Sequence, residues 1–272
     1  MLGQDVVSTA QAAGHESTAL SRAELDVTDF AAVKRAVSAA TPDVVINCAA
    51  WTDVDGAESS SEAADAVNGP GAGNVARAAT AAGAWTIHVS SDYVFDGFRR
   101  EPYVESDEPR PLSAYGRSKL AGELEVALEA PASHTIVRSS WLFGAGGRCF
   151  PATILRLAAE RDELTVVDDQ VGCPTFTGHL ARALTALATQ PSLGLVHVAG
   201  AGWCSWFDFA REVVSSAGLE CEIKPGRTAD LERPAARPLY SVLGTERPSE
   251  APKLPDWREG LAEYLAAGVS AV

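Results

Sequence analysis

Residues 85–95, WTIHVSSDYVF, decide the fold of this chain. The first half of the stretch is a short and nearly continuous apolar run, and polar residues follow where a strand would end. Similar runs stand at residues 43–49 (DVVINCA) and 134–143 (HTIVRSSWLF), with shorter ones at 164–167 and 195–199. Such runs are typical of strands that are buried on both faces, as in a parallel sheet.

Helical patterns separate these runs. Apolar residues recur at helical spacing in residues 1–13, 30–40, 58–82, 113–130, 149–161 and 177–189. The alternation of strands and helices predicts an α/β protein with a doubly wound (Rossmann) parallel sheet that is covered by helices on both faces.

The pattern changes after Gly200. A helix capped by Ser205 comes first, then a stretch rich in proline and charge, then a last helix that opens at Asp256. We therefore expect two regions. The NAD(P)-binding Rossmann domain takes residues 1–145 and roughly 178–200, and a smaller substrate-binding region takes residues 146–177 and 201–272.

Composition excludes several classes of protein. With 46% hydrophobic and 21% charged residues, the 272-residue chain reads as a folded globular protein. A net charge of -14 argues against nucleic acid or an anionic membrane as a partner. The five cysteines show no C-x-x-C spacing and the histidines are scattered, so we expect reduced thiols, a cytoplasmic protein and no metal site.

Residues 113–123, SAYGRSKLAGE, are the most informative for chemistry. Tyr115 and Lys119 lie four apart on a predicted helix and so share a face. An ammonium beside a phenol favours phenolate and lowers its pKa, which suits proton transfer near neutral pH. Tyr-x-x-x-Lys alone is weak, because such surface pairs are common. The hydroxyls at Ser90 and Ser91 follow a strand and face the same crevice, where they can bind a substrate carbonyl.

Six motifs in order carry a resemblance to a known family. They are DVVINCAAWTDVDGAE, VSSDYVFDG, PLSAYGRSKLAGE, RSSWLFG, VVDDQVGCPT and ARPLYSVL. Together they resemble the extended short-chain dehydrogenase/reductases and, more narrowly, the dTDP-4-dehydrorhamnose reductases. The likeness covers essentially the whole chain, and the D-x-Q-x-G-x-P-T pattern at residues 168–175 separates this branch from epimerases and dehydratases.

The resemblance implies roles for three catalytic residues. Tyr115 would protonate the C4 oxygen as hydride arrives, Lys119 would hold the nicotinamide ribose and lower the tyrosine pKa, and Ser91 would orient the sugar carbonyl. The implied substrate-binding residues are Ser91, Asp92, Trp141, Gln170, Thr175 and Arg237. Purely structural roles stay open for three of them. Trp141 would then belong to the core, Gln170 would cap a loop through its amide, and Arg237 would be a structural arginine between domains.

The resemblance also implies a cofactor site. Its residues would be Gly3, Gln4, Arg22, Asp26, Val27, Ala49, Ala50, Thr52, Tyr115 and Lys119. The segment Leu20-Ser21-Arg22 places a cation where an acidic residue would bind the ribose hydroxyl of NAD. This favours NADPH, while NADH use stays open, as does a plain solvated turn at Arg22.

The start of the chain differs from the family pattern. The family begins with a strand and a G-x-x-G-x-x-G loop, and here only Gly3-Gln4 matches the end of that loop. One hypothesis, which we favour, is that the natural chain starts upstream; the other is that the protein lacks the strand and has lost cofactor binding. Under the first hypothesis the 272-residue form binds NADPH poorly and is unstable, and a short N-terminal extension restores both.

The leading hypothesis for function is NADPH-dependent reduction of the C4 ketone of dTDP-4-dehydro-L-rhamnose to dTDP-L-rhamnose. The nucleotide sugar is then the partner, and a homodimer stays open. Three alternatives remain. They are another nucleotide-sugar ketoreductase or epimerase, a non-catalytic partner protein like the regulatory β subunit of methionine adenosyltransferase, and a reductase of some unrelated carbonyl.

Overall fold

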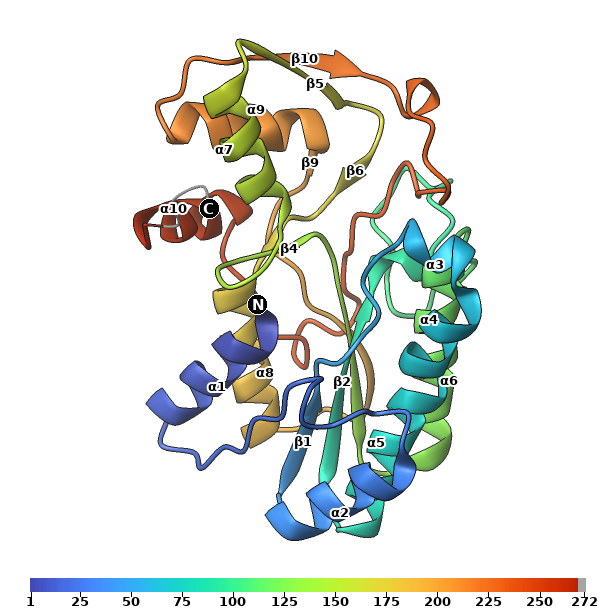
Figure 1. Ribbon diagram of the computed structural model, residues 1–272. Coiled ribbons are helices and arrows are strands. Elements are labelled where there is room, and N and C mark those ends of the chain that lie inside the picture. The colour runs from blue at the N-terminus through green and yellow to red at the C-terminus, as the bar shows by residue number, and fades with distance from the viewer. Residues whose placement is uncertain (269–272) are drawn as a thin grey trace.

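A four-stranded parallel sheet forms the centre of the larger of two lobes (Figure 1). The computed structural model describes residues 1–268. The strands run in the order β1 (Val44–Asn47), β2 (Trp85–Ser91), β3 (His134–Ser139) and β8 (Gly194–His197). All three pairings are parallel, so every strand ends at the same edge of the sheet. The predicted parallel α/β sheet is confirmed.

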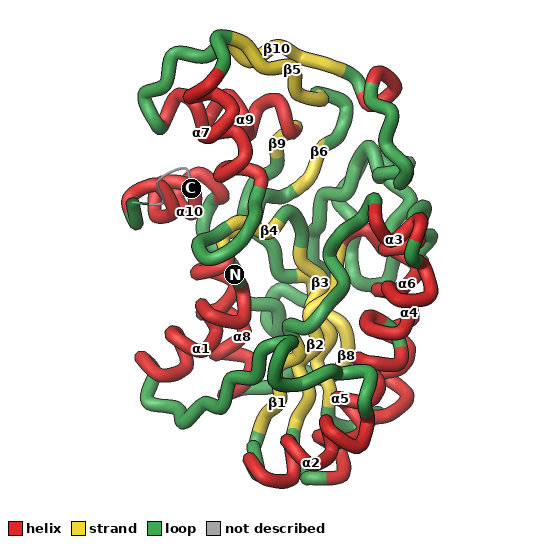
Figure 2. Tube along the Cα trace, in the orientation of Figure 1, coloured by secondary structure: helices red, strands yellow, loops and turns green. Residues whose placement is uncertain are grey.

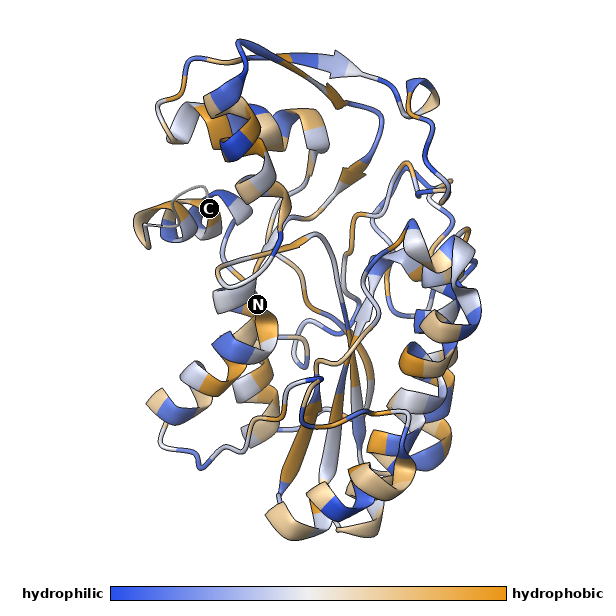
Figure 3. Cartoon of the chain, viewed as in Figure 1, coloured by the Kyte–Doolittle hydropathy of each residue, from blue (hydrophilic) through white to orange (hydrophobic). Residues whose placement is uncertain are grey.

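Helices cover both faces of this sheet, as expected. On one face α1 (Leu2–Ala12) and α8 (Thr177–Thr189) pack against the strands through a cluster that includes Leu2, Ile87 and Leu184. On the other face lie α2 (Phe30–Ala40), α5 (Pro70–Ala81) and α6 (Ala114–Glu129). Figure 3 shows apolar residues on strands of the sheet, and apolar and hydrophilic residues alternating along the helices around it. Burial of these apolar surfaces is the main stabilising term of the lobe.

The helix predicted at residues 58–82 is wrong in one respect, since the structure divides it into three. These are α3 (Gly56–Ser59), α4 (Ser61–Asn68) and α5. The second break falls at Gly69-Pro70, because proline has no N–H to continue a helix and is well placed at the first position of a new one.

The smaller lobe holds α7 (Phe150–Glu160), α9 (Trp206–Ser216) and α10 (Trp257–Ala266) around an aromatic core that includes Phe143, Phe209 and Tyr264. Ser205 caps α9 and Asp256 forms a capping box on α10, as predicted. One expectation needs correction. The apolar run at 164–167 lies in β5 (Glu163–Val167), which pairs with β10 (Glu222–Gly226) in this lobe and not with the main sheet.

Four two-residue strands form two further small sheets. They are β4 (Leu142–Phe143), β6 (Val171–Gly172), β7 (Thr175–Phe176) and β9 (Cys204–Ser205). β4 pairs with β7 and β6 with β9, and Figure 2 labels β4, β6 and β9. Two short 3-10 turns, η1 (Asp92–Val94) and η2 (Thr228–Asp230), follow β2 and β10. Within residues 1–268 no helix is both long and apolar enough to cross a bilayer.

Residues 15–21, which lead to Arg22, form an exposed loop and no strand. A strand needs a neighbour to bond with, and within the described residues β1 pairs with β2 alone. β1 is therefore an edge strand, and its apolar residues Val44, Val45 and Ile46 are only half-buried.

Candidate active site

The candidate catalytic residues meet where β2 ends. Ser91 is the last residue of β2, and its hydroxyl caps the η1 turn by accepting a hydrogen bond from the backbone N–H of Tyr93. Helix α6 begins at Ala114, capped by Ser113, and carries Tyr115 in its first turn. A side chain at Gly116 would lie 2.2 Å from the carbonyl oxygen of Tyr93. The glycine therefore lets α6 approach η1 closely enough to bring Tyr115 beside Ser91.

The phenol of Tyr115 is a protonated group at neutral pH. Burial raises its pKa to about 12, although a hydrogen bond with Ser91 works in the opposite direction. The structure does not show the lowering of this pKa by Lys119 that we expected. The Lys119 ammonium instead donates to the carbonyl oxygen of Val89 at 2.8 Å and so faces the strand.

Lys119 is itself strongly perturbed. Burial lowers its pKa to about 8, and the Glu123 carboxylate one turn further along α6 works against this. Glu123 holds Arg138 through two hydrogen bonds of 2.8 and 2.6 Å and accepts a third from Ser90. We did not predict Glu123 or Arg138 as site residues. The four-residue spacing of Tyr115, Lys119 and Glu123 was the signal that could have found the first.

Asp92 is almost fully enclosed. Its carboxylate accepts hydrogen bonds from Ser241 at 2.6 Å and from Ser91 at 3.1 Å. Burial raises the pKa of Asp92 to about 7 in spite of these bonds. Both oxygens are thus engaged by the protein, and Ser241 ties the ARPLYSVL stretch to the residue that follows β2.

The remaining substrate candidates lie on the smaller lobe. Trp141 has a φ of 47° and stacks on Trp206 with ring centroids 3.5 Å apart. Gln170 is buried, and its amide donates to Thr228 at 2.9 Å. Thr175 is also buried, and its hydroxyl bonds to backbone groups of Cys173 and Gly200, so it serves the loop itself.

Arg237 bridges the lobes. Its guanidinium forms a two-pronged ion pair with Asp55, with distances of 3.0 and 2.8 Å, and also donates to the carbonyl of Ala235. This contact agrees with the alternative that we left open, in which Arg237 is a structural arginine between the domains. Asp55 lies in the loop after β1, in the DVDGAE stretch.

The residues expected to hold the pyrophosphate of a dinucleotide lie around the start of α1 and fit that role. Gly3, near the start of α1, lies beside Cys48 at the end of β1, with an ideal Cβ 3.9 Å from the cysteine Cβ. No side chain caps α1, so its first N–H groups are available to an anion. Ala49, Ala50 and Thr52 follow β1 as exposed or half-buried residues near that helix start.

The residues expected to bind the adenosine end of the cofactor lie in a more open part of the structure. Arg22 lies in an exposed turn, the carboxylate of Asp26 accepts two hydrogen bonds from Thr28, and Val27 packs beside Gly71. Gln4 lies against Gly146 of the smaller lobe. The structure therefore brings Ser91, Tyr115 and Lys119 together but leaves Arg22 and Asp26 in an open loop.

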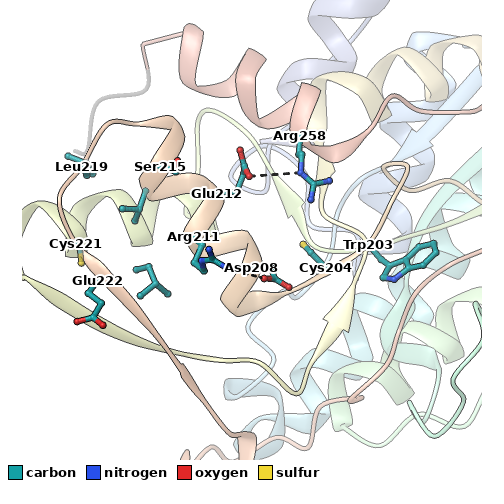
Figure 4. A pocket seen from close by; sticks show the side chains of 12 residues that line it. Trp203, Cys204, Asp208, Arg211, Glu212, Ser215, Leu219, Cys221, Glu222 and Arg258 are labelled. Atoms are coloured by element: carbon teal, nitrogen blue, oxygen red, sulfur yellow. Dashed lines mark ion pairs between the residues drawn. The ribbon is translucent and has the colours of Figure 1, made fainter.

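A separate hollow lies away from these residues. A cavity of about 790 Å³ lies between α9, β10 and the start of α10, and its walls carry ion pairs such as Arg258–Glu212 (Figure 4). None of the predicted site residues lines it. Its position in the smaller lobe separates it from the catalytic edge of the sheet.

A Rossmann-type sheet with serine, tyrosine and lysine at its carboxyl edge defines the short-chain dehydrogenase/reductase class. The family model described as "RmlD substrate binding domain" matches residues 1–269. The chain is 44% identical to a dTDP-4-dehydrorhamnose reductase of Mycolicibacterium smegmatis, covering 100% of this chain and 84% of that protein. This protein therefore belongs to the dTDP-4-dehydrorhamnose reductase family.

Solved structures agree with that placement. A dTDP-4-dehydrorhamnose reductase of Clostridium acetobutylicum superposes with a TM-score of 0.95 at 38% identity, covering 99% of this chain and 96% of that one. A second, from Bacillus anthracis in complex with NADP, gives a TM-score of 0.94 at 36% identity, covering 98% and 95%.

Proposed function

We propose that this protein reduces the C4 ketone of dTDP-4-dehydro-L-rhamnose to dTDP-L-rhamnose with NADPH. The named activity of the Mycolicibacterium smegmatis relative and the NADP in the Bacillus anthracis structure support this substrate and cofactor. The observation that carries the proposal is the meeting of Ser91, Tyr115 and Lys119 at one edge of the sheet, with the phenol held protonated.

The residues divide the work of a ketone reduction. A bound nicotinamide would supply the hydride for C4. Tyr115 donates its phenolic proton to the C4 oxygen, which converts the ketone to an alcohol and leaves a phenolate. The Ser91 hydroxyl, whose one proton is directed at Asp92 in the structure, would turn to donate to the same oxygen and orient it. Because burial opposes the phenolate, the nearby Lys119 ammonium matters most once that charge has formed.

Lys119 is also placed to hold the cofactor's ribose. Its ammonium has three N–H donors, and the bond to Val89 uses one of them. Since the side chain is buried, the other donors gain from a hydroxyl partner. NADPH is favoured over NADH on the sequence of the Arg22 segment.

The division into regions follows the same proposal. Residues 1–145 and about 178–200 would bind the cofactor, and 146–177 with 201–272 would bind the sugar nucleotide, the last four residues lying outside the described range. The five cysteines are all free thiols, which suits a cytoplasmic enzyme.

The test is Tyr115→Phe, followed by NADPH absorbance with dTDP-4-dehydro-L-rhamnose. We expect kcat to fall by at least about 100-fold, because general acid catalysis is lost while the ring still packs. Binding of NADPH and dTDP should persist. Tyr240→Phe, which removes a phenol outside the site, is the matched control. A phenylalanine variant that reduces the sugar at the parent rate overturns the proposal.

A further inference from the structure

We propose that Arg233 binds the diphosphate of the nucleotide-sugar substrate, and that Arg237 supports this site without contacting the phosphates. The inference rests on the function proposed above. Arg233-Pro234 precedes the Arg237-Pro238 pair in the sequence ERPAARPLY. Either arginine could therefore be the one that binds the diphosphate. Their surroundings in the structure separate them.

A small cavity of about 140 Å³ lies beside both arginines. That volume has room for several water molecules, and hence for a pair of phosphate groups. Its polar lining comes from Gln170, Thr228 and the two arginines. The lining residues are Gln170, Thr228, Leu231, Arg233, Ala235, Ala236 and Arg237.

Arg237 has little left to offer a ligand. Three of its five N–H donors are used by Asp55 and by the carbonyl of Ala235, and the phenol of Tyr93 is a further partner. Its side chain is only 12% exposed. The guanidinium is thus fixed by the protein before any substrate arrives.

The guanidinium of Arg233, by contrast, is largely exposed and has few protein partners. Its side chain is 53% exposed, and Asp55 at 3.4 Å is its one ion-pair partner among the described residues. A guanidinium with most of its donors open can grip phosphate oxygens in pairs. Asp55 already bonds Arg237 at shorter distances, so Arg233 is the cation whose charge is least compensated.

The cavity lies at a suitable place relative to the chemistry. The Tyr93 ring packs edge-on against Tyr115, with centroids 5.7 Å apart, and the same Tyr93 bonds Arg237. In a nucleotide sugar the diphosphate is attached at C1, across the ring from C4. A ligand whose C4 oxygen reaches Tyr115 can therefore extend past Tyr93 toward Arg233.

The charged groups around the cavity leave Arg233 as the cation that an anionic substrate would contact. Asp55 stays ionised, because its hydrogen bond to Arg237 lowers its pKa. Asp169, near the opposite wall, accepts bonds from the N–H and hydroxyl of Thr228. With a net charge of -14 on the whole chain, an anionic substrate needs a cation of this kind at its point of contact.

The experiment compares Arg233→Ala with Arg156→Ala. Arg156 is a matched control, since its side chain is 48% exposed and it also has an ion pair of 3.4 Å, with Glu160 on α7. Calorimetry gives the Kd of dTDP and of thymidine, and NADPH oxidation gives kcat and KM. For Arg233→Ala we expect the Kd of dTDP and the KM of the sugar to rise about 10- to 100-fold, from loss of a charged hydrogen bond.

The other readouts isolate the phosphates. We expect thymidine binding, NADPH binding and kcat at saturating sugar to change less than about twofold in Arg233→Ala, and every constant to do so in Arg156→Ala. Equal dTDP affinity in the two variants overturns the inference, as does an equal loss of thymidine and dTDP binding. If the parent binds dTDP through Arg233 yet does not reduce the sugar, the proposed function fails and this inference stands.

Discussion

Asp92 shows how burial acts on a single residue. Its carboxyl is enclosed by Ser91 and Ser241, and burial raises its pKa to about 7. Its titratable neighbours Tyr93 and Tyr115 have pKa values raised far above neutrality, so they do not titrate in the same range. Of these three groups, Asp92 is the one whose charge changes near neutral pH.

We expect Asp92→Asn to flatten the dependence of stability on pH. An unfolded aspartic acid loses its proton near pH 4, whereas the folded one keeps it up to about 7. Between these values the native state binds more protons, so this residue's contribution to stability falls as pH rises. The slope is about 1.4 kcal/mol per pH unit within the window.

Urea unfolding at about pH 5 and about pH 8 checks this, with the exposed Asp65→Asn as the control. The difference between the parent and Asp92→Asn should shift in favour of the variant at the higher pH. Curves that stay parallel for the parent and Asp92→Asn would show that the carboxyl does not titrate in this window.

Helix α6 presents the site because it packs closely on its neighbours. Tyr115, Lys119 and Glu123 follow one face of it, and Gly122 meets α4. A Cβ on Gly122 would lie 2.1 Å from the backbone carbonyl oxygen of Asn68, which has no flexible end to move aside. The amide of Asn68 also bonds Ser118 and the Trp51 backbone.

We therefore expect Gly122→Ala to push α4 and α6 apart. Overpacking of this kind typically costs about 1–3 kcal/mol of unfolding free energy. Because Asn68 holds Trp51 in the loop after β1, kcat should fall as well. Leu124→Ala, at a 65% exposed position on the same helix, should change stability by less than about 0.5 kcal/mol. Urea unfolding measures both variants, and similar values for the two would contradict close packing at Gly122.

At the scale of helices and strands, the sequence predicted where the elements lie better than it predicted which elements and residues they contact. Apolar runs and caps located β2, α6 and α9 to within a few residues. The run at 164–167 was apolar enough to predict a strand, yet nothing local says that β5 pairs with β10. In the same way, spacing put Lys119 beside Tyr115. The turn of its ammonium toward Val89 depends on how α6 packs on the sheet, which is a tertiary fact.

The two lobes are joined across the site by one late segment of the chain. Arg237 meets Asp55, Ser241 meets Asp92, and Thr245 bonds Glu105. Asp55 precedes α3 in the segment that follows β1, and Asp92 is the first residue of η1, directly after β2. The site is therefore shaped by contacts between residues more than 130 apart in the chain, which is why motif spacing alone left the role of Arg237 open.

We expect the ion pair between Asp55 and Arg237 to contribute to the stability of the whole molecule. Asp55 is 31% and Arg237 12% exposed at the side chain, and the pair is two-pronged. A double-mutant cycle with Asp55→Asn and Arg237→Met, read by urea unfolding, should give a coupling energy of about 1–3 kcal/mol. The exposed pair Arg156–Glu160 on α7, treated likewise, should give about 0.5 kcal/mol or less, because solvent screens it. Equal coupling in the two cycles would mean that the lobes are held by their apolar contacts and by Ser241, with the arginine adding only local order.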